Sequence, residues 1–145
     1  MKTISTTRKI NASPARVFAV VAHLDEWSDA LPHVIKFEFL TEQKSGVGTR
    51  FCETRLMGKS EAVTELEVTE YTQDERIRLV GDSHGAEWDT VWTVEADGEG
   101  SVLKIDMDAR SYKLMAKIMN KLFRGMIAKA VEKDVDLIKA YCEKG

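Results

Sequence analysis

The residues from 33 to 110 alternate between apolar and polar side chains, and this pattern constrains the fold more than any other feature of the chain. Successive side chains of a β-strand point to opposite faces, so a period of two predicts strands with one apolar and one polar face. Short turns at 46–48, 73–75 and 97–100 interrupt the pattern. Because strands joined by short connections pair antiparallel, this region predicts a six-stranded antiparallel meander.

A second pattern runs from Ser111 to Lys144, where Gly125 is the only glycine and proline does not occur. Apolar residues recur there at helical spacing, which predicts one long C-terminal helix with a single broad apolar stripe. The stripe consists of Met115, Met119, Leu122, Met126, Ile127, Val131, Val135, Ile138 and Cys142. A helix of about thirty residues is about 45 Å long, enough to cross the sheet and cover its apolar face.

The N-terminal part predicts a strand at residues 2–10, followed by two short helices. Ser13 suits the N-cap of the first helix, and Pro14 suits its first position, where a missing N–H costs nothing. The second helix is expected around residues 25–30 and ends before Pro32. Residues 1–145 therefore predict one α+β domain: a strand, two helices, six strands and a long helix.

The composition is that of a globular protein, with 43% hydrophobic and 31% charged residues. A net charge of −3 argues against nucleic acid as the main partner. We expect a cytoplasmic protein, because the N-terminus has no apolar signal-peptide core and no apolar run is long enough to span a membrane. The two cysteines and three histidines lack metal-ligand spacing, so we expect free thiols, no metal and no cofactor.

Several short segments carry a resemblance to a known family. They are I-N-A-S-P-A-R-V-F at 10–18, Trp27 with Leu31-Pro32, G-V-G-T-R-F at 46–51, V-T-E-Y at 68–71 and D-G-E-G-S at 97–101. In this order they resemble the START-like (SRPBCC, Bet v 1-like) superfamily, and within it the polyketide cyclase/dehydrase and lipid-transport group. The resemblance implies a helix-grip fold, in which a curved antiparallel sheet of about seven strands wraps around the C-terminal helix. It also implies a ligand between sheet and helix.

The alternation of the strands, together with the helix stripe, gives a set of candidate ligand-binding residues. The sheet contributes Phe37, Phe39, Phe51, Glu53, Arg55, Met57, Leu66, Leu79, Trp88, Trp92 and Met107, and the helix contributes Met115, Met119 and Phe123. A densely packed core is the alternative for the apolar members. A cavity is favoured by the methionines, which adapt to irregular shapes, and by the polar residues on the apolar face.

Glu53 and Arg55 are those polar residues, since they share a face with Phe51 if the strand alternates strictly. A buried carboxylate and guanidinium must be paired or hydrogen-bonded, so we expect them to bind the polar end of a ligand. The alternative is a one-residue bulge near Gly48. It would expose both charged side chains to solvent and direct Cys52, Thr54 and Leu56 toward the core.

The start of the C-terminal helix is basic, and no acidic residue occurs from Ser111 to Ala130. The basic residues are Lys113, Lys117, Lys121, Arg124 and Lys129. Cations at a helix N-terminus oppose the helix dipole and so destabilise the helix. We therefore expect these residues to contribute a favourable interaction elsewhere. Two interpretations stay open: transient contact with an anionic membrane or acidic partner, and a solvated face balanced by acids on the sheet.

The leading functional hypothesis is binding, or transport, of a hydrophobic small molecule such as a lipid, an isoprenoid quinone or a polyketide-like aromatic. The first alternative is a cyclase or aromatase in which Glu53 or Tyr112 transfers a proton. The second is a protein-interaction or co-chaperone-like module. Neither the ligand, nor any turnover, nor the oligomeric state follows from the sequence.

Overall fold

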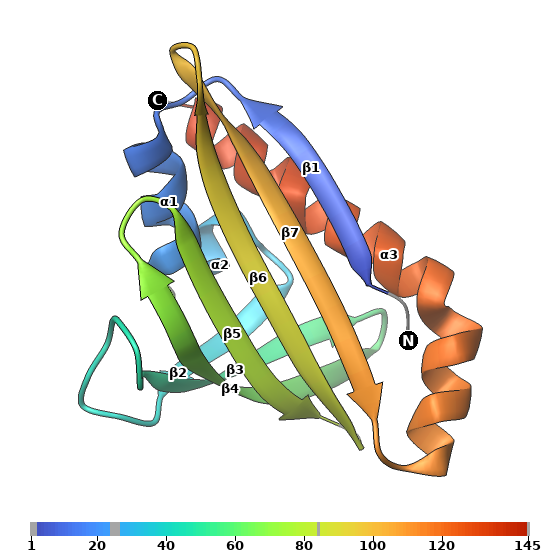
Figure 1. The fold of residues 1–145 in the computed structure, drawn as a ribbon. Coiled ribbons are helices and arrows are strands. Elements are labelled where there is room, and N and C mark those ends of the chain that lie inside the picture. The colour runs from blue at the N-terminus through green and yellow to red at the C-terminus, as the bar shows by residue number, and fades with distance from the viewer. Residues whose placement is uncertain (1–2, 24–26, 84, 145) are drawn as a thin grey trace.

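The computed structural model describes residues 3–23, 27–83 and 85–144 and contains one curved sheet, two short helices and one long helix (Figure 1). The elements follow the predicted order. They are β1 (Ile4–Ile10), α1 (Pro14–Ala22), α2 (Trp27–Ala30), β2 (Val34–Phe39), β3 (Arg50–Met57), β4 (Ser60–Thr72), β5 (Arg76–Ser83), β6 (Ala86–Asp97), β7 (Gly100–Ser111) and α3 (Leu114–Glu143). The predicted helix-grip architecture is therefore confirmed.

The seven strands form one antiparallel sheet in the order β1-β7-β6-β5-β4-β3-β2. Strands β2 to β7 make the predicted meander, and β1 joins it along β7, pairing Ile4 with Met107 and Ile10 with Ser101. The register shifts between Val34 and Lys36 in β2 and between Val68 and Glu70 in β4. Irregularities of this kind bend strands, and the sheet curls so that β2 to β4 pass behind β5 to β7 in Figure 1.

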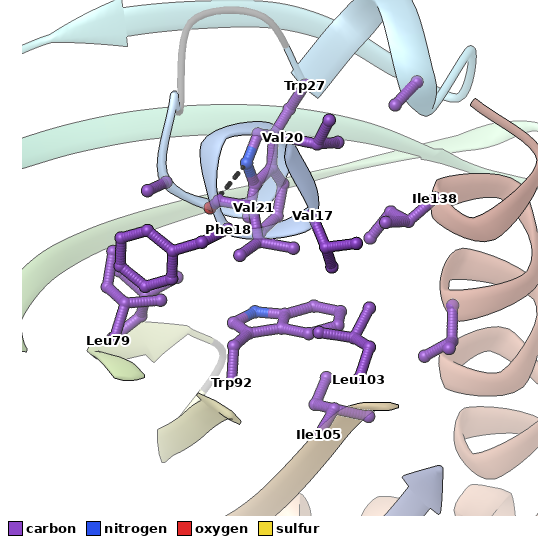
Figure 2. Packing of buried hydrophobic residues seen from close by; sticks show 14 of the residues in the cluster. Val17, Phe18, Val20, Val21, Trp27, Leu79, Trp92, Leu103, Ile105 and Ile138 are labelled. Carbon is purple, nitrogen blue, oxygen red and sulfur yellow. Dashed lines mark hydrogen bonds between the residues drawn. The ribbon is translucent and has the colours of Figure 1, made fainter. Parts of the chain in front are cut away.

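The helices α1 and α2 cover one end of the concave face. The Ser13 side chain accepts a hydrogen bond from the backbone N–H of Arg16, which caps α1 as predicted. In α2, which starts at Trp27 next to undescribed residues, the Trp27 indole donates to the Val21 carbonyl and meets the Trp92 ring edge-on at 6.2 Å. Figure 2 shows these groups packed together in the main apolar core.

The second half of α3 packs into the same core. Val131, Val135, Ile138 and Cys142 are buried along it, and Ile138 points toward the α1 side chains in Figure 2. Three polar contacts hold this half to β1 and its end. They join Arg8 Nε to Asp136 Oδ1 at 2.9 Å, Lys139 Nζ to the Lys9 carbonyl at 2.6 Å, and the Asn11 N–H to Glu143 Oε2 at 2.8 Å.

The first half of α3 differs from our expectation of one continuous apolar stripe. Its large apolar side chains are exposed, for example Leu114 at 74% and Leu122 at 70%. At about 100° per residue, the series Met115 to Met126 and the series Val131 to Cys142 lie about 160° apart around the helix axis. The prediction of a single stripe was therefore wrong. Each step of three or four residues fits a helix, but the steps through Ile127 connect two series that lie on different faces.

The convex face of the sheet is polar and carries several ion pairs, as the alternation predicts. Arg78 bonds Asp89 on β6 and Glu70 on β4, and Arg50 bonds Glu65 across β3 and β4. Hydrogen bonds from Arg78 and Arg76 hold the pKa of the Glu70 carboxyl below its usual value. The polar convex face leaves the concave face as the place where apolar and chemically active residues meet.

Candidate functional site

Strand β3 places the acidic and basic candidates on the concave face. It pairs with β4 without interruption from Arg50 to Met57, so its side chains keep strict alternation. Glu53 is 6% exposed, and Arg55 is mostly buried, whereas Leu56 on the opposite face is exposed. Thr54 on that opposite face is buried as well. The alternative of a bulge near Gly48 is therefore wrong for this strand; the bulges lie in β2 and β4 instead.

Arg55 is the centre of a four-residue polar cluster made by three parts of the chain. Its Nε donates to Glu53 Oε1 at 3.0 Å on the same strand, and its Nη1 donates to Asp134 Oδ2 at 2.7 Å on α3. His33, in the turn before β2, lies with Nε2 2.9 Å from Asp134 Oδ1 and 3.4 Å from Arg55 Nη1. The cluster therefore joins β3 to the buried half of α3.

The hydrogen bonding of the cluster is incomplete. Burial alone would lower the pKa of Arg55, but the charges and hydrogen bonds of Glu53 and Asp134 outweigh burial and raise the pKa. Glu53 Oε2 is buried and has no hydrogen-bond partner among the described residues. An unsatisfied buried polar atom costs about 1–3 kcal/mol. The cluster thus contains two carboxylates, one guanidinium and one imidazole, and Glu53 Oε2 is a hydrogen-bond acceptor that no described group uses.

Aromatic side chains lie beside this cluster. The rings of Phe37 and Phe51 stack with centroids 5.0 Å apart, and Phe39 meets Phe37 edge-on at 5.1 Å. Phe37 is the cross-strand partner of Glu53, and Leu66 is that of Phe51. Phe37 and Phe39 are only half-buried. The candidate site thus combines an aromatic wall, formed by Phe37, Phe39 and Phe51, with a polar cluster at one end.

The other predicted ligand-binding residues are not brought together with this wall. Leu79 and Trp92 are buried in the core beneath α1 and α2 (Figure 2), while Trp88 and Met107 are half-buried farther along the concave face. The Met57 side chain lies outside the described residues. Met115, Met119 and Phe123 on α3 are exposed. In the first half of the helix, the large apolar side chains do not lie on the side of the helix that packs on the sheet.

The two catalytic candidates lie in different places. Tyr112 precedes α3, and its hydroxyl donates to both carboxylate oxygens of Asp82, which raises the pKa of the tyrosine. Glu53 is tied through Arg55 to Asp134, twenty residues into α3. Twenty helical residues rise about 30 Å, so Tyr112 and Glu53 do not act on the same bond.

Two members of the cluster were missed as binding residues from sequence. His33 was considered only as a metal ligand, and Asp134 was not singled out. Asp134 does have a signal: it lies three residues after Val131 and four before Ile138, inside the apolar stripe that packs on the core. An acid at such a position is expected to have a buried partner, and here the partners are Arg55 and His33.

Two of the surface cavities in the described part of the chain lie away from the aromatic wall. One, of about 420 Å³, lies around Lys9, Asp97 and Lys139. The other, of about 720 Å³, lies between the end of β7 and the first half of α3. Over the described ranges, no cluster of three or more His, Cys, Asp or Glu side chains is arranged to hold a metal ion. No described helix is long and apolar enough to cross a membrane.

Comparison with known proteins places this geometry in a family. Residues 1–143 match the family described as polyketide cyclase / dehydrase and lipid transport. The chain belongs to that family. Among curated proteins, none matches the chain by sequence.

Several solved structures share the fold of this chain. The Zhui aromatase/cyclase from Streptomyces sp. R1128 has a TM-score of 0.79 at 14% identity, over 99% of this chain and 94% of that one. A START superfamily protein from Mycobacterium smegmatis has a TM-score of 0.76 at 12% identity, over 96% and 97% of the two chains. Ara h 8.0201 has a TM-score of 0.74 at 13% identity, over 99% of both chains. At such identities the likeness shows the fold alone.

Proposed function

We propose that this member of the polyketide cyclase/dehydrase and lipid-transport family binds a hydrophobic small molecule against the concave face of the sheet. The observation that carries the proposal is the buried Glu53 Oε2, which lacks a partner among the described residues. A ligand group that donates a hydrogen bond would satisfy this atom. Because Glu53 Oε2 is an acceptor, it favours a hydroxyl, phenol or ammonium group over a carboxylate, which has no proton to donate when ionised.

The apolar part of the ligand would lie along the aromatic wall. Phe37 and Phe39 are half-buried and available for contact, whereas Phe51 is fully buried behind them. Aromatic rings interact with each other at centroid separations of about 4.5–7 Å, so flat aromatic or quinone-like ligands suit this surface well. Family membership supports hydrophobic ligand binding in general, and the hydroxylated aromatic class is the narrower proposal.

A set of three probes tests the polar preference. We expect 2-naphthol to bind at least about tenfold more tightly than 2-methoxynaphthalene, because a hydrogen bond to a charged group contributes about 1.5–3 kcal/mol. We expect 2-naphthoate to bind most weakly. Fluorescence titration gives the three dissociation constants. Native mass spectrometry of the purified protein shows, in addition, whether a hydroxylated apolar molecule copurifies.

Glu53→Gln separates the proposed role from a purely structural one. The variant keeps the shape of the side chain and is expected to lose most of the preference for 2-naphthol over 2-methoxynaphthalene. Glu65→Gln, on the exposed convex face, is the matched control and should leave the preference unchanged. Equal affinities for the three probes in the native protein would rule out the proposed headgroup site.

A second function, cyclisation of a poly-keto chain, is favoured by one observation. A buried carboxylate lies beside a guanidinium, so Glu53 can take a proton while Arg55 stabilises the developing enolate. For such an enzyme, Glu53→Gln is expected to abolish turnover of a poly-keto substrate analogue while the analogue still binds. Tyr112→Phe should retain activity, since Tyr112 is remote from the cluster. Absence of turnover in the native protein would leave binding as the function.

A further inference from the structure

The first half of α3 exposes a continuous apolar surface. All seven large apolar side chains from Leu114 to Met126 are exposed, with Leu114, Met115 and Leu122 at 70% or more. At about 100° per residue they occupy one side of the helix, about half of its circumference. Isolated exposed apolar residues are ordinary, but a contiguous apolar surface on one helix face marks an interaction site.

Positive charge accompanies this apolar face. The five basic residues between Ser111 and Ala130 are unopposed by any acid there, and the rest of the chain, with the total at −3, sums to −8. The helix begins at Leu114, its N-cap residue Lys113 makes no side-chain capping bond, and its first turn contains no acid. The missing cap and the basic residues both destabilise the N-terminal end of the helix, because its first N–H groups lack a partner and cations oppose the helix dipole there. The charge separation gives the protein one positive end.

A basic cleft borders the same helix segment. The cavity of about 720 Å³ between the end of β7 and α3 is lined by Arg110, Lys117, Lys121 and Arg124, with Asp108 as the only acidic residue in its lining. Lys117 and Lys121 come from the helix turns that also carry Ile118 and Leu122, so cleft and apolar face share one segment. Concave basic surfaces of this kind suit phosphate-bearing groups.

We propose that residues 113–129 dock this protein onto an anionic lipid bilayer. The helix lies in the membrane interface, with its apolar face at the boundary of headgroups and acyl chains and its lysines and the basic cleft among the lipid phosphates. A strongly amphipathic helix with Lys and Arg on its polar side binds membranes in this way. The proposal does not depend on the ligand proposed above.

The charge pattern favours a bilayer over the other occupants of such a face. A second copy of the chain would bring five further positive charges against the first five, which repel. An acidic protein surface would neutralise the lysines but gives no reason for seven apolar side chains beside them. An anionic bilayer offers both the negative surface and the apolar layer.

Vesicle flotation with the full chain tests the docking. We expect binding to vesicles of 60% phosphatidylcholine and 40% phosphatidylglycerol at low salt. We expect at least tenfold weaker binding to pure phosphatidylcholine, and at least tenfold weaker binding in 0.5 M NaCl. No binding to the anionic vesicles at low salt would overturn the proposal.

Paired variants identify the surface. Lys117→Glu/Lys121→Glu should weaken binding at least about twentyfold, since each lysine near the surface is worth about fivefold. Lys9→Glu/Lys36→Glu changes the net charge equally elsewhere and should bind much more tightly than the helix variant. Equal binding by the two double variants would show non-specific attraction and overturn the proposal.

The apolar contribution has its own pair. Leu122→Ser should weaken binding about tenfold, whereas Val63→Ser, on the exposed face of β4, should not. Both side chains are exposed, so neither variant is expected to unfold; circular dichroism checks this. A concentration-dependent dimer that Leu122→Ser abolishes, together with unchanged flotation of that variant, would assign the face to a second copy and overturn the proposal.

Discussion

The two halves of α3 have similar shares of apolar residues and opposite surroundings. The half from Val131 to Cys142 is buried against the core and fastened to β1 by side-chain contacts at its end. The half from Leu114 to Met126 has its large apolar side chains in solvent. Hydrophobicity alone therefore does not tell which half of a helix supports the fold; the direction of the apolar face does.

This contrast separates stability from interaction along one element. Asp134 belongs to the buried half and joins it to the Arg55 cluster, so that half also shapes the candidate ligand site. The exposed half contributes little to the core and is available for a partner. The following substitutions and measurements test this difference between the two halves of α3.

The largest effect is expected for truncation in the buried half. Ile138 is 2% exposed, so Ile138→Ala should lower the free energy of unfolding by about 2–5 kcal/mol through lost burial and the remaining cavity. Leu122→Ala removes a comparable side chain from the exposed half and should change it by less than about 0.5 kcal/mol. Urea unfolding followed by circular dichroism measures both. Similar losses for the two variants would contradict the division of the helix.

Thiol labelling reports the same contrast without changing the core. Burial raises the pKa of the Cys142 thiol to about 11, two units above the ordinary 9, so its thiolate fraction at pH 8 is about a hundredfold lower. Cys142 should react with a thiol reagent only as the protein unfolds. A cysteine introduced by Leu122→Cys should react at the rate of an unfolded chain, with the half-buried Cys52 measured in the parent as background. Fast labelling of Cys142 in the native protein would show that the second half opens readily.

A smaller effect is expected at the junction between the halves. A Cβ at Gly125 would meet no described atom within 4 Å. Gly125→Ala should therefore stabilise the helix by about 0.5–1 kcal/mol, because alanine has the higher helix propensity. Thermal unfolding measures the shift. A loss of stability would contradict the open surroundings of Gly125 and show that a side chain is not tolerated there.

The smallest effect concerns the last turn of the buried half. Hydrogen bonds from the Asn11 N–H and from Lys139 lower the pKa of Glu143 below its ordinary 4.5. A carboxyl with a depressed pKa adds stability that is present above its unfolded pKa and is lost as the pH falls through the folded value. Glu143→Gln should therefore be slightly less stable than the parent at pH 7, and the difference should vanish at an acidic pH below the depressed pKa of the folded state. Urea titrations at both pH values test this, and a constant difference would assign the effect to geometry rather than charge.

Much of the fold was predictable because local chemistry and long-range pairing agree. The period of two indicates the strands, the glycine turns separate them and Ser13-Pro14 starts the first helix, and the structure confirms the resulting order. The apolar face of α3 was not predicted correctly. Spacings of three and of four residues both fit a helix, but several such steps together rotate the apolar stripe around the helix axis. Counting the rotation from Met115 to Cys142 shows the change of face from sequence alone.

The candidate site was predictable only in part. Strict alternation put Glu53 and Arg55 on the apolar face, where the structure also has them. Their partners come from a turn twenty residues earlier and from a helix nearly eighty residues later, and nothing local in the sequence links His33 or Asp134 to Arg55. Contacts that close a three-dimensional cluster depend on how α3 lies over the sheet, which no periodicity encodes. That these residues bind a ligand stays a prediction.

The order of the strands has a consequence for how α3 can move relative to the sheet. The two edge strands, β1 and β2, do not pair with each other in the described sheet, and α3 runs alongside β1 (Figure 1). In a closed barrel, widening the interior requires breaking the ladder between two strands. Here the element next to β1 is the helix α3, which is held by side chains. Its first half can therefore move outward without loss of any backbone hydrogen bond between strands. The concave side can therefore open at the expense of side-chain contacts alone.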